Sequence, residues 1–472
     1  AEADRERQTA ERTLAQVQAQ AVASPVAELS DLAQMADQKA QELEIDEATT
    51  RVLIDAQLRA AGWEADSRTL RHAIGTRPEA GRAIAIAEWP TESGRVDYAL
   101  FIDGQAVGVI EAKRAIRNVA ERLGQSRRYG RDIILTPEQK LTFIPSEDAT
   151  AFRVPFVFAT NGRPYFKRLE TLSGIWFWDA RTGEPQRALM DWFSPRDLTA
   201  RLEQKLDLTA LEDPDRQFGV TGLRDYQIEA IHAVEAAIAN GQRRLLIAMA
   251  TGTGKTRLAI ALMYELLRAQ RFRRVLFLVD RKALGVQTLD SMSNTETASL
   301  LKFDKIFPIA GMDKAIPDLE DRVQVSTVQA MIRRLFDNPD GQHLTPGSYD
   351  LIIVDEAHRG YVLDAELRDD DLGFRNLDDY LSAYRRVLDY FDATQIALTA
   401  TPALHTREIF GAPVFHYSYR QAVIAGHLID HRPPRRITTA LSQTGIHFDA
   451  GEEVAVVDSR TNQVDLFDLE DE

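Results

Sequence analysis

Residues 244–267 read RLLIAMATGTGKTRLAIALMYELL, and this stretch decides the fold of the motif-bearing part of the chain. The apolar run 244–249 predicts a buried parallel strand, and the apolar residues of 256–267 recur with helical period. The glycine-rich segment between them is therefore a strand-to-helix loop, where backbone N–H groups and a helix N-terminus bind phosphate. The stretch predicts an open α/β sheet with a nucleotide site at its edge.

The polar residues of this loop fit the chemistry of ATP bound with Mg²⁺. The glycines let backbone N–H groups approach the β-phosphate, Lys255 reaches the β- and γ-phosphates, and the Thr256 hydroxyl can ligate Mg²⁺. Met249 stands where the strict pattern has its first glycine, which leaves the Gly-x-Gly-Lys-Thr core intact. The alternative is a chance glycine-rich turn. The residues expected to bind the nucleotide are Thr251, Gly252, Thr253, Gly254, Lys255 and Thr256.

A second apolar strand, expected over 350–354, ends in two carboxylates. Ligands of open α/β sheets bind at the carboxyl ends of the strands. We expect Asp355 to hold Mg²⁺ and Glu356 to orient or deprotonate the attacking water. We expect His358 to couple the nucleotide state to DNA. An isolated Asp-Glu pair would be a solvated strand end, and its occurrence about a hundred residues after the phosphate loop favours the functional interpretation.

Further motifs follow in a fixed order around this loop. The amide of Gln227 can bind an adenine edge, and the hydroxyls of Thr399 and Thr401 follow another apolar strand, where they could relay the phosphate state. Residues 275–281 and 323–329 are β-rich runs that end in polar residues. Together these segments resemble the ordered motifs of superfamily 2 helicases and translocases.

This resemblance implies two RecA-like lobes, the second of which supplies an arginine to the γ-phosphate. No second lobe is recognisable after Pro402, and the chain begins without Met. We therefore expect an N-terminal fragment of a longer protein. ATP turnover by this piece alone should be weak or absent, although nucleotide binding could survive.

A second group of chemically active residues precedes the motor motifs. Residues 96–102 and 107–113 flank Asp103-Gly104, the signature of a β-hairpin. The hairpin places Asp97 near one end, with Glu111 and Lys113 on one face of the returning strand. Two carboxylates held together favour a cation between them, and a neighbouring lysine can stabilise charge on a phosphate. Asp97 and Glu111 are therefore expected Mg²⁺ ligands; the alternative is a solvated strand face.

The spacing Asp-x₁₃-Glu-x-Lys resembles the core of PD-(D/E)XK nucleases. Gln125 and Tyr129 share a helix face and resemble the Gln-x₃-Tyr element that follows this core in nucleases fused to DNA motors. The surrounding segment has a local excess of positive charge suited to phosphate contact, the alternative being an ordinary exposed helix face. Its basic residues are Lys113, Arg114, Arg117, Arg122, Arg127, Arg128 and Arg131, opposed by Glu121.

A nuclease core followed by a superfamily 2 motor resembles the restriction (R) subunit of Type I restriction enzymes. Residues 50–63 resemble the opening helix of that family, 355–361 its extended motif II, and 417–423 the segment after its motor motifs. The resemblance implies duplex DNA and methyltransferase (M) and specificity (S) subunits as partners, and ATP-driven translocation coupled to cleavage. The resemblance also suggests Glu47 as a candidate third metal ligand, the alternative being a surface helix carboxylate. The alternatives are a helicase whose N-terminal domain only binds DNA, and an assembly scaffold that binds nucleotide without turnover.

The composition is compatible with these expectations. A formal charge of −15, from 57 basic and 72 acidic side chains, argues against broad nucleic-acid binding but leaves room for a local basic groove. The absence of Cys excludes disulfide scaffolds and zinc-thiolate sites. No apolar run approaches the length of a membrane span and no signal peptide is visible, so we expect a cytoplasmic protein without membrane partners.

The expected organisation combines two α/β domains: a PD-(D/E)XK-like mixed sheet and a RecA-like parallel sheet. We place a helical arm at 1–44, the nuclease-like domain at 45–207, a linker at 208–220, the first motor lobe at 221–420 and a connection toward a second lobe at 421–472. Strands are also expected over 152–158 and 174–178. The aromatic residues near the second of these could stack on bases, but strand spacing favours a core position for Trp176, Phe177, Trp178 and Trp192.

Overall fold

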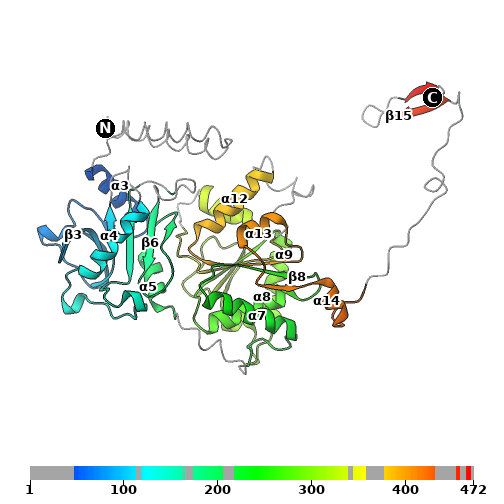
Figure 1. The fold of residues 1–472 in the computed structure, drawn as a ribbon, viewed down its shortest axis with the longest axis horizontal. Coiled ribbons are helices and arrows are strands. Elements are labelled where there is room, and N and C mark those ends of the chain that lie inside the picture. The colour runs from blue at the N-terminus through cyan, green and yellow to red at the C-terminus, as the bar shows by residue number, and fades with distance from the viewer. Residues whose placement is uncertain are drawn as a thin grey trace. The chain divides into compact units, whose positions relative to one another are not determined.

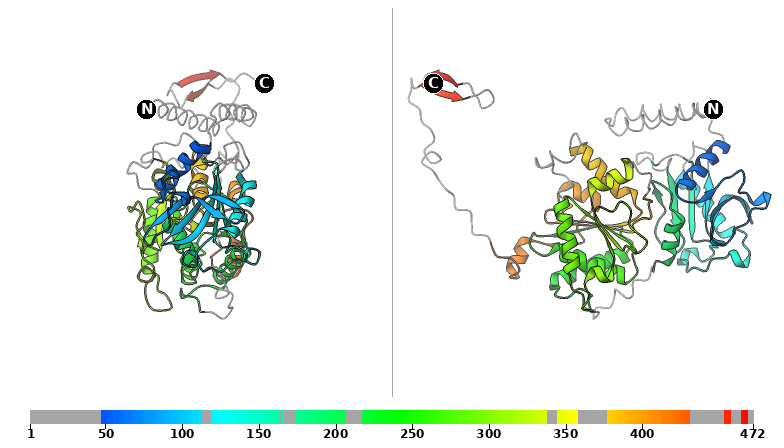
Figure 2. Two further views of the ribbon diagram at one scale, coloured as in Figure 1. Left: turned by 90° about the vertical axis from the view of Figure 1, so that its left-hand side faces the viewer. Right: turned by 180° about the vertical axis from the view of Figure 1, so that it is seen from behind.

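The computed structural model describes residues 47–112, 119–162, 165, 174–205, 217–337, 344–357, 377–430, 453–457 and 464–468. The chain forms two compact units, Ala1–Ala422 and Val423–Glu472. The first unit contains two seven-stranded sheets (Figures 1 and 2). In the second unit, β15 (Glu453–Val457) and β16 (Val464–Asp468) form an antiparallel pair. The expected helical arm at 1–44 lies outside the described residues.

The first sheet is mixed, with its strands in sequence order from β1 to β7. Strands β2, β3 and β4 are antiparallel neighbours, while β4 and β5 run parallel. The predicted hairpin is confirmed, and its turn residues Asp103 and Gly104 have φ of 50° and 81°, as a two-residue hairpin turn requires. The strands are β1 (Glu64–Ala65), β2 (Ala83–Thr91), β3 (Gly94–Ile102), β4 (Gln105–Ala112), β5 (Phe156–Thr160), β6 (Ile175–Asp179) and β7 (Arg187–Leu189).

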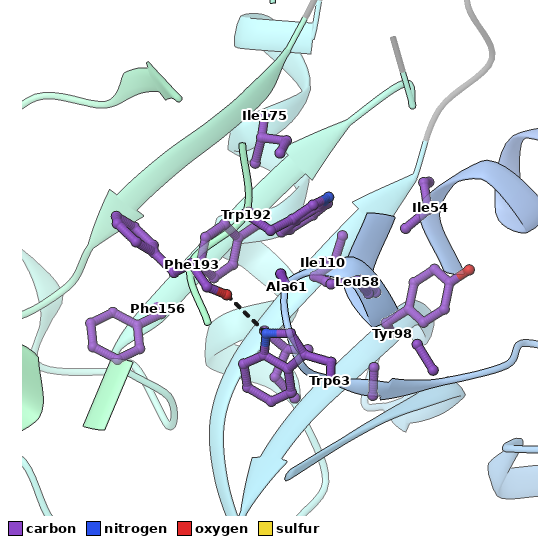
Figure 3. Close-up of a cluster of buried hydrophobic side chains, with 14 of the residues drawn as sticks. Ile54, Leu58, Ala61, Trp63, Tyr98, Ile110, Phe156, Ile175, Trp192 and Phe193 are labelled. Carbon is purple, nitrogen blue, oxygen red and sulfur yellow. Dashed lines mark hydrogen bonds between the residues drawn. The ribbon is translucent and has the colours of Figure 1, made fainter. Parts of the chain in front are cut away.

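Helices cover both faces of this sheet. The helices α3 (Glu47–Ala60) and α5 (Pro195–Glu203) contribute to one buried cluster, in which the Trp63 indole donates to the carbonyl of Phe193 at 2.9 Å (Figure 3). Helix α4 (Val119–Asp132) packs on the other face with Leu123 and Tyr129. The preference for a core position of the four aromatic residues is confirmed, since Trp176, Phe177, Trp178 and Trp192 are all buried.

The second sheet is wholly parallel, in the order β10-β11-β9-β12-β13-β8-β14. The predicted strand and helix around the phosphate loop are confirmed as β8 (Arg244–Met249) and α8 (Lys255–Arg268). The other strands are β9 (Val275–Val279), β10 (Ile309–Ala310), β11 (Val323–Thr327), β12 (Leu351–Val354), β13 (Thr394–Thr399) and β14 (Phe415–Tyr417). This architecture confirms the expected fold class.

The structure explains why two of the predicted runs are only partly strand. The run expected over 323–329 ends at Thr327, whose side chain accepts from the backbone N–H of Ala330 at 3.2 Å and so begins helix α11 (Val328–Ile332). The run expected over 152–158 becomes a strand only at Phe156, after Pro155, which has no N–H for a sheet ladder.

Helices also cover both faces of the second sheet. One buried cluster joins the sheet to α11, α12 (Leu377–Tyr390) and α13 (Leu404–Phe410), while α7 (Asp225–Ala239) and α8 lie on the other side (Figure 1). No helix among the described residues is long and apolar enough to cross a membrane. The remaining helices are α9 (Lys282–Asn294), α10 (Phe303–Ile306), α14 (Tyr419–Ile424) and the short turns His72–Ile74, Pro137–Gln139, Glu147–Ala149 and Arg333–Asp337.

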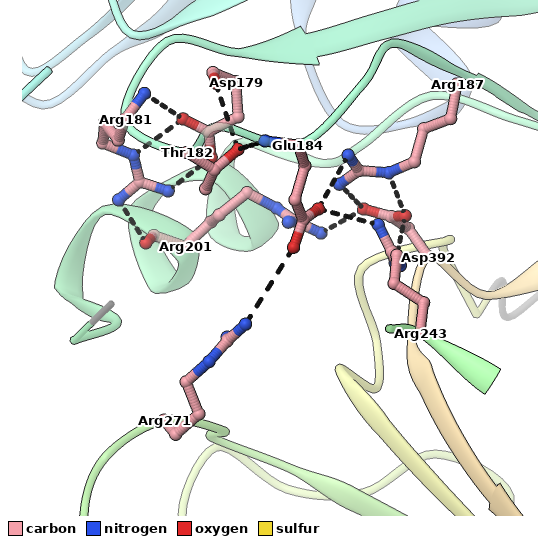
Figure 4. A network of polar contacts seen from close by, with 9 residues as sticks. All are labelled: Asp179, Arg181, Thr182, Glu184, Arg187, Arg201, Arg243, Arg271 and Asp392. Carbon is pink, nitrogen blue, oxygen red and sulfur yellow. Dashed lines mark hydrogen bonds and ion pairs between the residues drawn. The ribbon is translucent and has the colours of Figure 1, made fainter. Parts of the chain in front are cut away.

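A buried carboxylate, Asp392, joins the two large sheets. Arg187 of β7 binds both of its oxygens, at 2.6 and 2.7 Å, and Arg201 of α5 adds a contact of 2.6 Å. Arg243, directly before β8, donates to the same carboxylate at 2.7 Å (Figure 4). Glu184 also pairs with Arg187 and Arg243, each at 3.2 Å. We call these five residues the arginine cage; its members come from both sheets.

Candidate functional site

The phosphate loop lies at the carboxyl end of β8, where the ends of the parallel strands meet. Gly252 and Gly254 have φ of 84° and 81°, a region that disfavours other residues. A Cβ on Gly254 would also lie 2.7 Å from the amide nitrogen of Gln227. The hydroxyl of Thr253 donates to the carbonyl of Ala250 at 2.6 Å, which closes the loop. Thr251 lies exposed in the same turn, and Thr256 is the second residue of α8.

Gln227 is buried directly behind the loop and hydrogen-bonded to it. Its amide nitrogen donates to the carbonyls of Thr253 and Gly254, at 3.3 and 3.1 Å, and its oxygen accepts from the backbone of Arg224 at 3.0 Å. The hydroxyl of Tyr226 donates to the Thr253 carbonyl at 2.8 Å. In this geometry Gln227 fixes the loop, and its predicted contact with adenine would require it to exchange these partners.

The two carboxylates predicted after β12 meet the loop. Glu356 lies 3.3 Å from the Lys255 ammonium, measured from Oε1 to Nζ. Its φ of 48° places the backbone in the left-handed region, and its N–H donates to Oδ1 of Asp355 at 2.9 Å. A strained non-glycine residue at a strand end is typical of functional sites. The structure therefore brings Lys255, Asp355 and Glu356 together, as the sequence predicts.

The threonines after β13 have unequal environments. The Thr399 side chain is buried and exchanges hydrogen bonds with the backbone N–H and carbonyl of Thr401, both at 3.2 Å, so it shapes the turn. Thr401 itself is exposed. His358 lies outside the described residues, and its role stays a prediction.

The predicted nuclease pair lies on adjacent strands of the first sheet. Tyr98 pairs with Ile110, so Asp97 and Glu111 each stand one residue beyond this last recorded pair of β3 and β4. Oδ2 of Asp97 accepts from the backbone N–H of Ala112 at 2.8 Å, which holds Asp97 against the end of β4. Glu111 is only 2% exposed. Lys113 lies outside the described residues, and so does the side chain of Glu47.

The helix after this hairpin contains the predicted Gln-x₃-Tyr element. The Gln125 amide donates to the Tyr129 hydroxyl at 3.0 Å, and Tyr129 is buried against the sheet. The basic residues nearby divide into two kinds. The Arg127 guanidinium lies 4.1 Å from the centre of the Trp178 ring and is half-buried, so it caps the core, whereas Arg128 and Arg131 are exposed.

The donor chemistry of the pair suits a hard cation, since Mg²⁺ prefers carboxylate oxygens together with water. Among the described residues, however, no group of three or more His, Cys, Asp or Glu side chains is placed to hold a metal ion. Two protein carboxylates are enough for Mg²⁺, which is commonly bound through one or two of them. The residues therefore fit a cation held by Asp97 and Glu111 with water completing its shell.

Two further residues contact this site and were not singled out as functional from the sequence. Arg51 of α3 donates to Oδ1 of Asp97 at 2.9 Å and to Glu88 of β2 at 3.0 Å. Hydrogen bonds from Arg71 and Arg51 lower the pKa of Glu88, so this carboxyl is ionised at neutral pH. The available sequence signal was an isolated acidic residue in the apolar strand Ala83–Thr91.

Comparison with known proteins gives matches to both sheets. Residues 64–202 match the family model described as the second domain of the Type I restriction enzyme EcoKI endonuclease subunit. Residues 221–404 match the model described as the Type III restriction enzyme, res subunit. A solved fragment of a putative HsdR subunit of a Type I restriction enzyme from Vibrio vulnificus YJ016 aligns at 24% identity and a TM-score of 0.31, covering 80% of this chain and 60% of that one.

Relatives of known identity are much longer than this chain. The EcoKI endonuclease subunit of Escherichia coli (strain K12) is 44% identical over 441 residues, 87% of this chain and 37% of that protein. The EcoAI endonuclease subunit of Escherichia coli is 31% identical over 303 residues, 61% of this chain and 33% of that protein. The chain thus spans about a third of the length of these two relatives. Across the part that aligns, this chain belongs to the family of Type I restriction enzyme endonuclease subunits.

Proposed function

We propose that this chain supplies the nuclease and the first motor lobe of a Type I restriction complex, which moves along duplex DNA using ATP and cuts it. The observation that supports the proposal is that the predicted residues gather in two groups, Asp97 with Glu111 and Lys255 with Glu356, on two different sheets of one compact unit. The proposed cofactors are ATP and Mg²⁺. The proposed partners are duplex DNA and methyltransferase and specificity subunits, in the cytoplasm.

In the motor, the loop around Gly252 and Gly254 binds phosphate through backbone N–H groups and the N-terminus of α8. The contact of 3.3 Å between Lys255 and Glu356 supports this role, because each side chain satisfies the other's charge until a nucleotide arrives. Lys255 then turns to the phosphates and Glu356 is released to orient water. Thr256 and Asp355 would hold the Mg²⁺, which neutralises charge on the phosphate oxygens.

In the nuclease, Asp97 and Glu111 would hold a Mg²⁺ ion, which activates water and stabilises charge on the scissile phosphate. The Ala112 N–H fixes one oxygen of Asp97 on the side of β4, beside Glu111. We assign Lys113 to stabilise the phosphate charge. The hydrogen-bonded pair Gln125 and Tyr129 would orient the DNA backbone from α4.

The test uses the longer parent protein reconstituted with its methyltransferase and specificity subunits, in Mg²⁺ and ATP. Lys113→Ala should abolish cleavage and leave DNA-stimulated ATP hydrolysis intact, because the two sites lie on different sheets. Lys255→Ala should abolish both activities, since cleavage at a distance depends on translocation. Lys140→Ala and Lys305→Ala remove exposed lysines from the same two regions and should change neither activity.

Persistent cleavage by Lys113→Ala would exclude this lysine as an essential group and remove the nuclease assignment as stated. Absence of both activities from the reconstituted wild type would contradict the assigned partners.

A second candidate is a translocase whose first domain binds DNA without cutting it. The observation favouring it is that both oxygens of Asp97 already accept hydrogen bonds from the protein, one from Arg51 and one from the Ala112 N–H. It predicts DNA-stimulated ATP hydrolysis without cleavage in the wild type, even though the Asp97 and Glu111 site is folded.

A further inference from the structure

We infer that Glu88 and Arg51 form a relay that positions the carboxylate of Asp97 toward the cation site of the nuclease. The inference rests on the proposed nuclease function. It assigns both as positioning residues, which act through Asp97.

The relay consists of one guanidinium between two carboxylates. Arg51 uses its two terminal nitrogens separately, Nη1 to Oε1 of Glu88 at 3.0 Å and Nη2 to Oδ1 of Asp97 at 2.9 Å. All three side chains are largely buried, with exposures of 20%, 16% and 13% for Arg51, Glu88 and Asp97. Contacts shielded in this way are worth more than surface ion pairs, because water screens them less.

The sheet register explains why an arginine is needed here. Ala87 pairs with Tyr98 and Trp89 pairs with Val96, so Glu88 stands opposite Asp97. Like charges directly opposed on neighbouring strands repel. Continuing the register of β3 and β4 places Glu111 next in the same row, so three carboxylates follow one another across three strands. Arg51 supplies the positive charge between the first two.

The backbone of Glu88 is strained, which shows that its surroundings hold this row of carboxylates in place. Glu88 has φ of 54°. Its neighbours Ala87 and Trp89 both pair with residues of β3, whereas Glu88 is left out of that ladder. A non-glycine residue in the left-handed region is strained, because its Cβ lies too close to the following carbonyl oxygen. Such strain persists only where the surroundings fix it, and the contacts from Arg71 at 2.5 Å and from Arg51 do so.

The relay leaves Asp97 able to bind a cation. An ionised carboxylate has about four lone-pair sites. Asp97 uses one on Oδ1 for Arg51 and one on Oδ2 for the Ala112 N–H. Both oxygens therefore keep a lone pair, while the two donors fix the plane of the carboxylate. This is how outer-shell partners orient ligands in metal sites, where their loss costs about 10- to 100-fold in affinity or activity.

The test measures Mn²⁺ binding to the full chain by the loss of the free-ion EPR signal, without nucleotide or DNA. All proteins carry Asp355→Asn, so that the motor's own cation site does not contribute. The Mn²⁺ binding that is lost in Glu111→Gln is assigned to the nuclease site. Arg51→Ala should weaken its Mn²⁺ binding by about 10- to 100-fold. Arg51→Lys should give an intermediate loss, because the ammonium keeps the charge but lacks the rigid fork of the guanidinium, and Glu88→Gln should give a smaller loss.

Arg95→Ala is the matched control. Arg95 lies 3.5 Å from the same Glu88 carboxylate but is 64% exposed, and no contact between it and Asp97 is recorded. Arg95→Ala also removes one positive charge beside the row of carboxylates. Because that charge is exposed and screened by water, the Mn²⁺ affinity should stay within about twofold of the affinity of the protein that keeps Arg95. Tryptophan fluorescence checks that each variant is folded. If Arg51→Ala is unfolded, Arg51→Lys takes its place in the test.

The outcomes separate the relay from the function on which it rests. If Glu111→Gln leaves Mn²⁺ binding unchanged, the proposed nuclease cation site fails and the relay with it. If Glu111→Gln removes binding but Arg51→Ala leaves it unchanged, only the relay fails. If Arg51→Ala tightens binding, Arg51 competes with the cation instead of positioning its ligand, and the inference is overturned.

Discussion

Replacing Asp392 by alanine should weaken the contact between the two large sheets. It should lower the free energy of unfolding by more than the removal of a surface carboxylate does. Asp392 is the common acceptor of the arginine cage, and its side chain is 3% exposed. Burial alone would raise its pKa, but Arg187, Arg243 and Arg201 hold the pKa of Asp392 well below its ordinary value. The carboxylate is therefore ionised and fully paired in the folded protein.

The magnitude follows from what the substitution leaves behind. Four hydrogen bonds of 2.6–2.7 Å disappear together. Arg187 and Arg243 keep Glu184 as a partner, each at 3.2 Å, so these two guanidiniums then share one carboxylate, while Arg201 loses its contact of 2.6 Å. Removing one partner of a buried ion pair costs about 3–5 kcal/mol, because the remaining charge is left buried and uncompensated. We expect a loss in this range for Asp392→Ala.

Urea unfolding can locate this loss, because all five tryptophans of the chain lie between residues 63 and 192. Tryptophan fluorescence therefore reports on the first sheet alone. Asp392 belongs to the second sheet's region, two residues before β13. With a urea dependence of about 1–3 kcal/mol per molar, a loss of 3 kcal/mol lowers the midpoint by about 1 M or more. A fluorescence midpoint that moves on mutation of Asp392 shows that the cage couples the two sheets.

Asp389→Ala is the control for this measurement. Asp389 accepts from Arg244 at 2.6 Å, but that arginine is 42% exposed, and such a pair contributes about 0–1 kcal/mol. The reasoning is refuted if Asp392→Ala and Asp389→Ala lower the midpoint equally. It is also refuted if Asp392→Ala lowers the free energy of unfolding by less than about 1 kcal/mol, because removal of a buried, fully paired carboxylate should leave uncompensated buried charge.

Three further predictions concern pH and the nucleotide site. Because the pKa of Asp392 is depressed, its stabilising contribution is present above about pH 4 and is lost as the pH falls toward the folded-state value, so Asp392→Asn should flatten acid unfolding curves in this range. Gly254→Ala should weaken ATP binding at least about tenfold by calorimetry, while Gly241→Ala, with φ of 77° and no atom within 4 Å of the added Cβ, should not. Glu356→Gln should retain or strengthen ATP binding and reduce hydrolysis by the longer protein about 10²- to 10⁴-fold, measured by phosphate release.

The motor site was predictable from sequence because its residues are close to their strands. Lys255 and Glu356 each follow a buried apolar run, and parallel strands place their carboxyl ends at one edge. The hairpin itself was predictable for a similar reason, since Asp103-Gly104 marks a two-residue turn. The register that places Glu111 opposite Asp97 was not, because it depends on a bulge between Leu100 and Phe101 that shifts the pairing by one residue.

The contacts of Arg51 and Asp392 depend on tertiary packing and had no comparable signal. Arg51 reaches Asp97 across 46 positions and Arg187 reaches Asp392 across 205. Neither residue stands out from the other charged residues of its segment. The left-handed backbone of Glu88 was equally hidden, because the Ile, Ala and Trp residues around it predict an ordinary strand.

The arginine cage links the nuclease-like sheet to the strands that carry the nucleotide site. Arg243 directly precedes β8, and Asp392 lies two residues before β13, so the cage holds the amino ends of these two neighbouring strands. Their carboxyl ends bear the phosphate loop and Thr399. Six residues of strand span roughly 20 Å at about 3.3 Å per residue, so the cage and the phosphate loop lie at opposite ends of the same short strands. Under the proposed function, the first sheet should therefore follow the first motor lobe as that lobe moves. Asp392→Ala in the longer protein should then uncouple cleavage from translocation while each site stays intact.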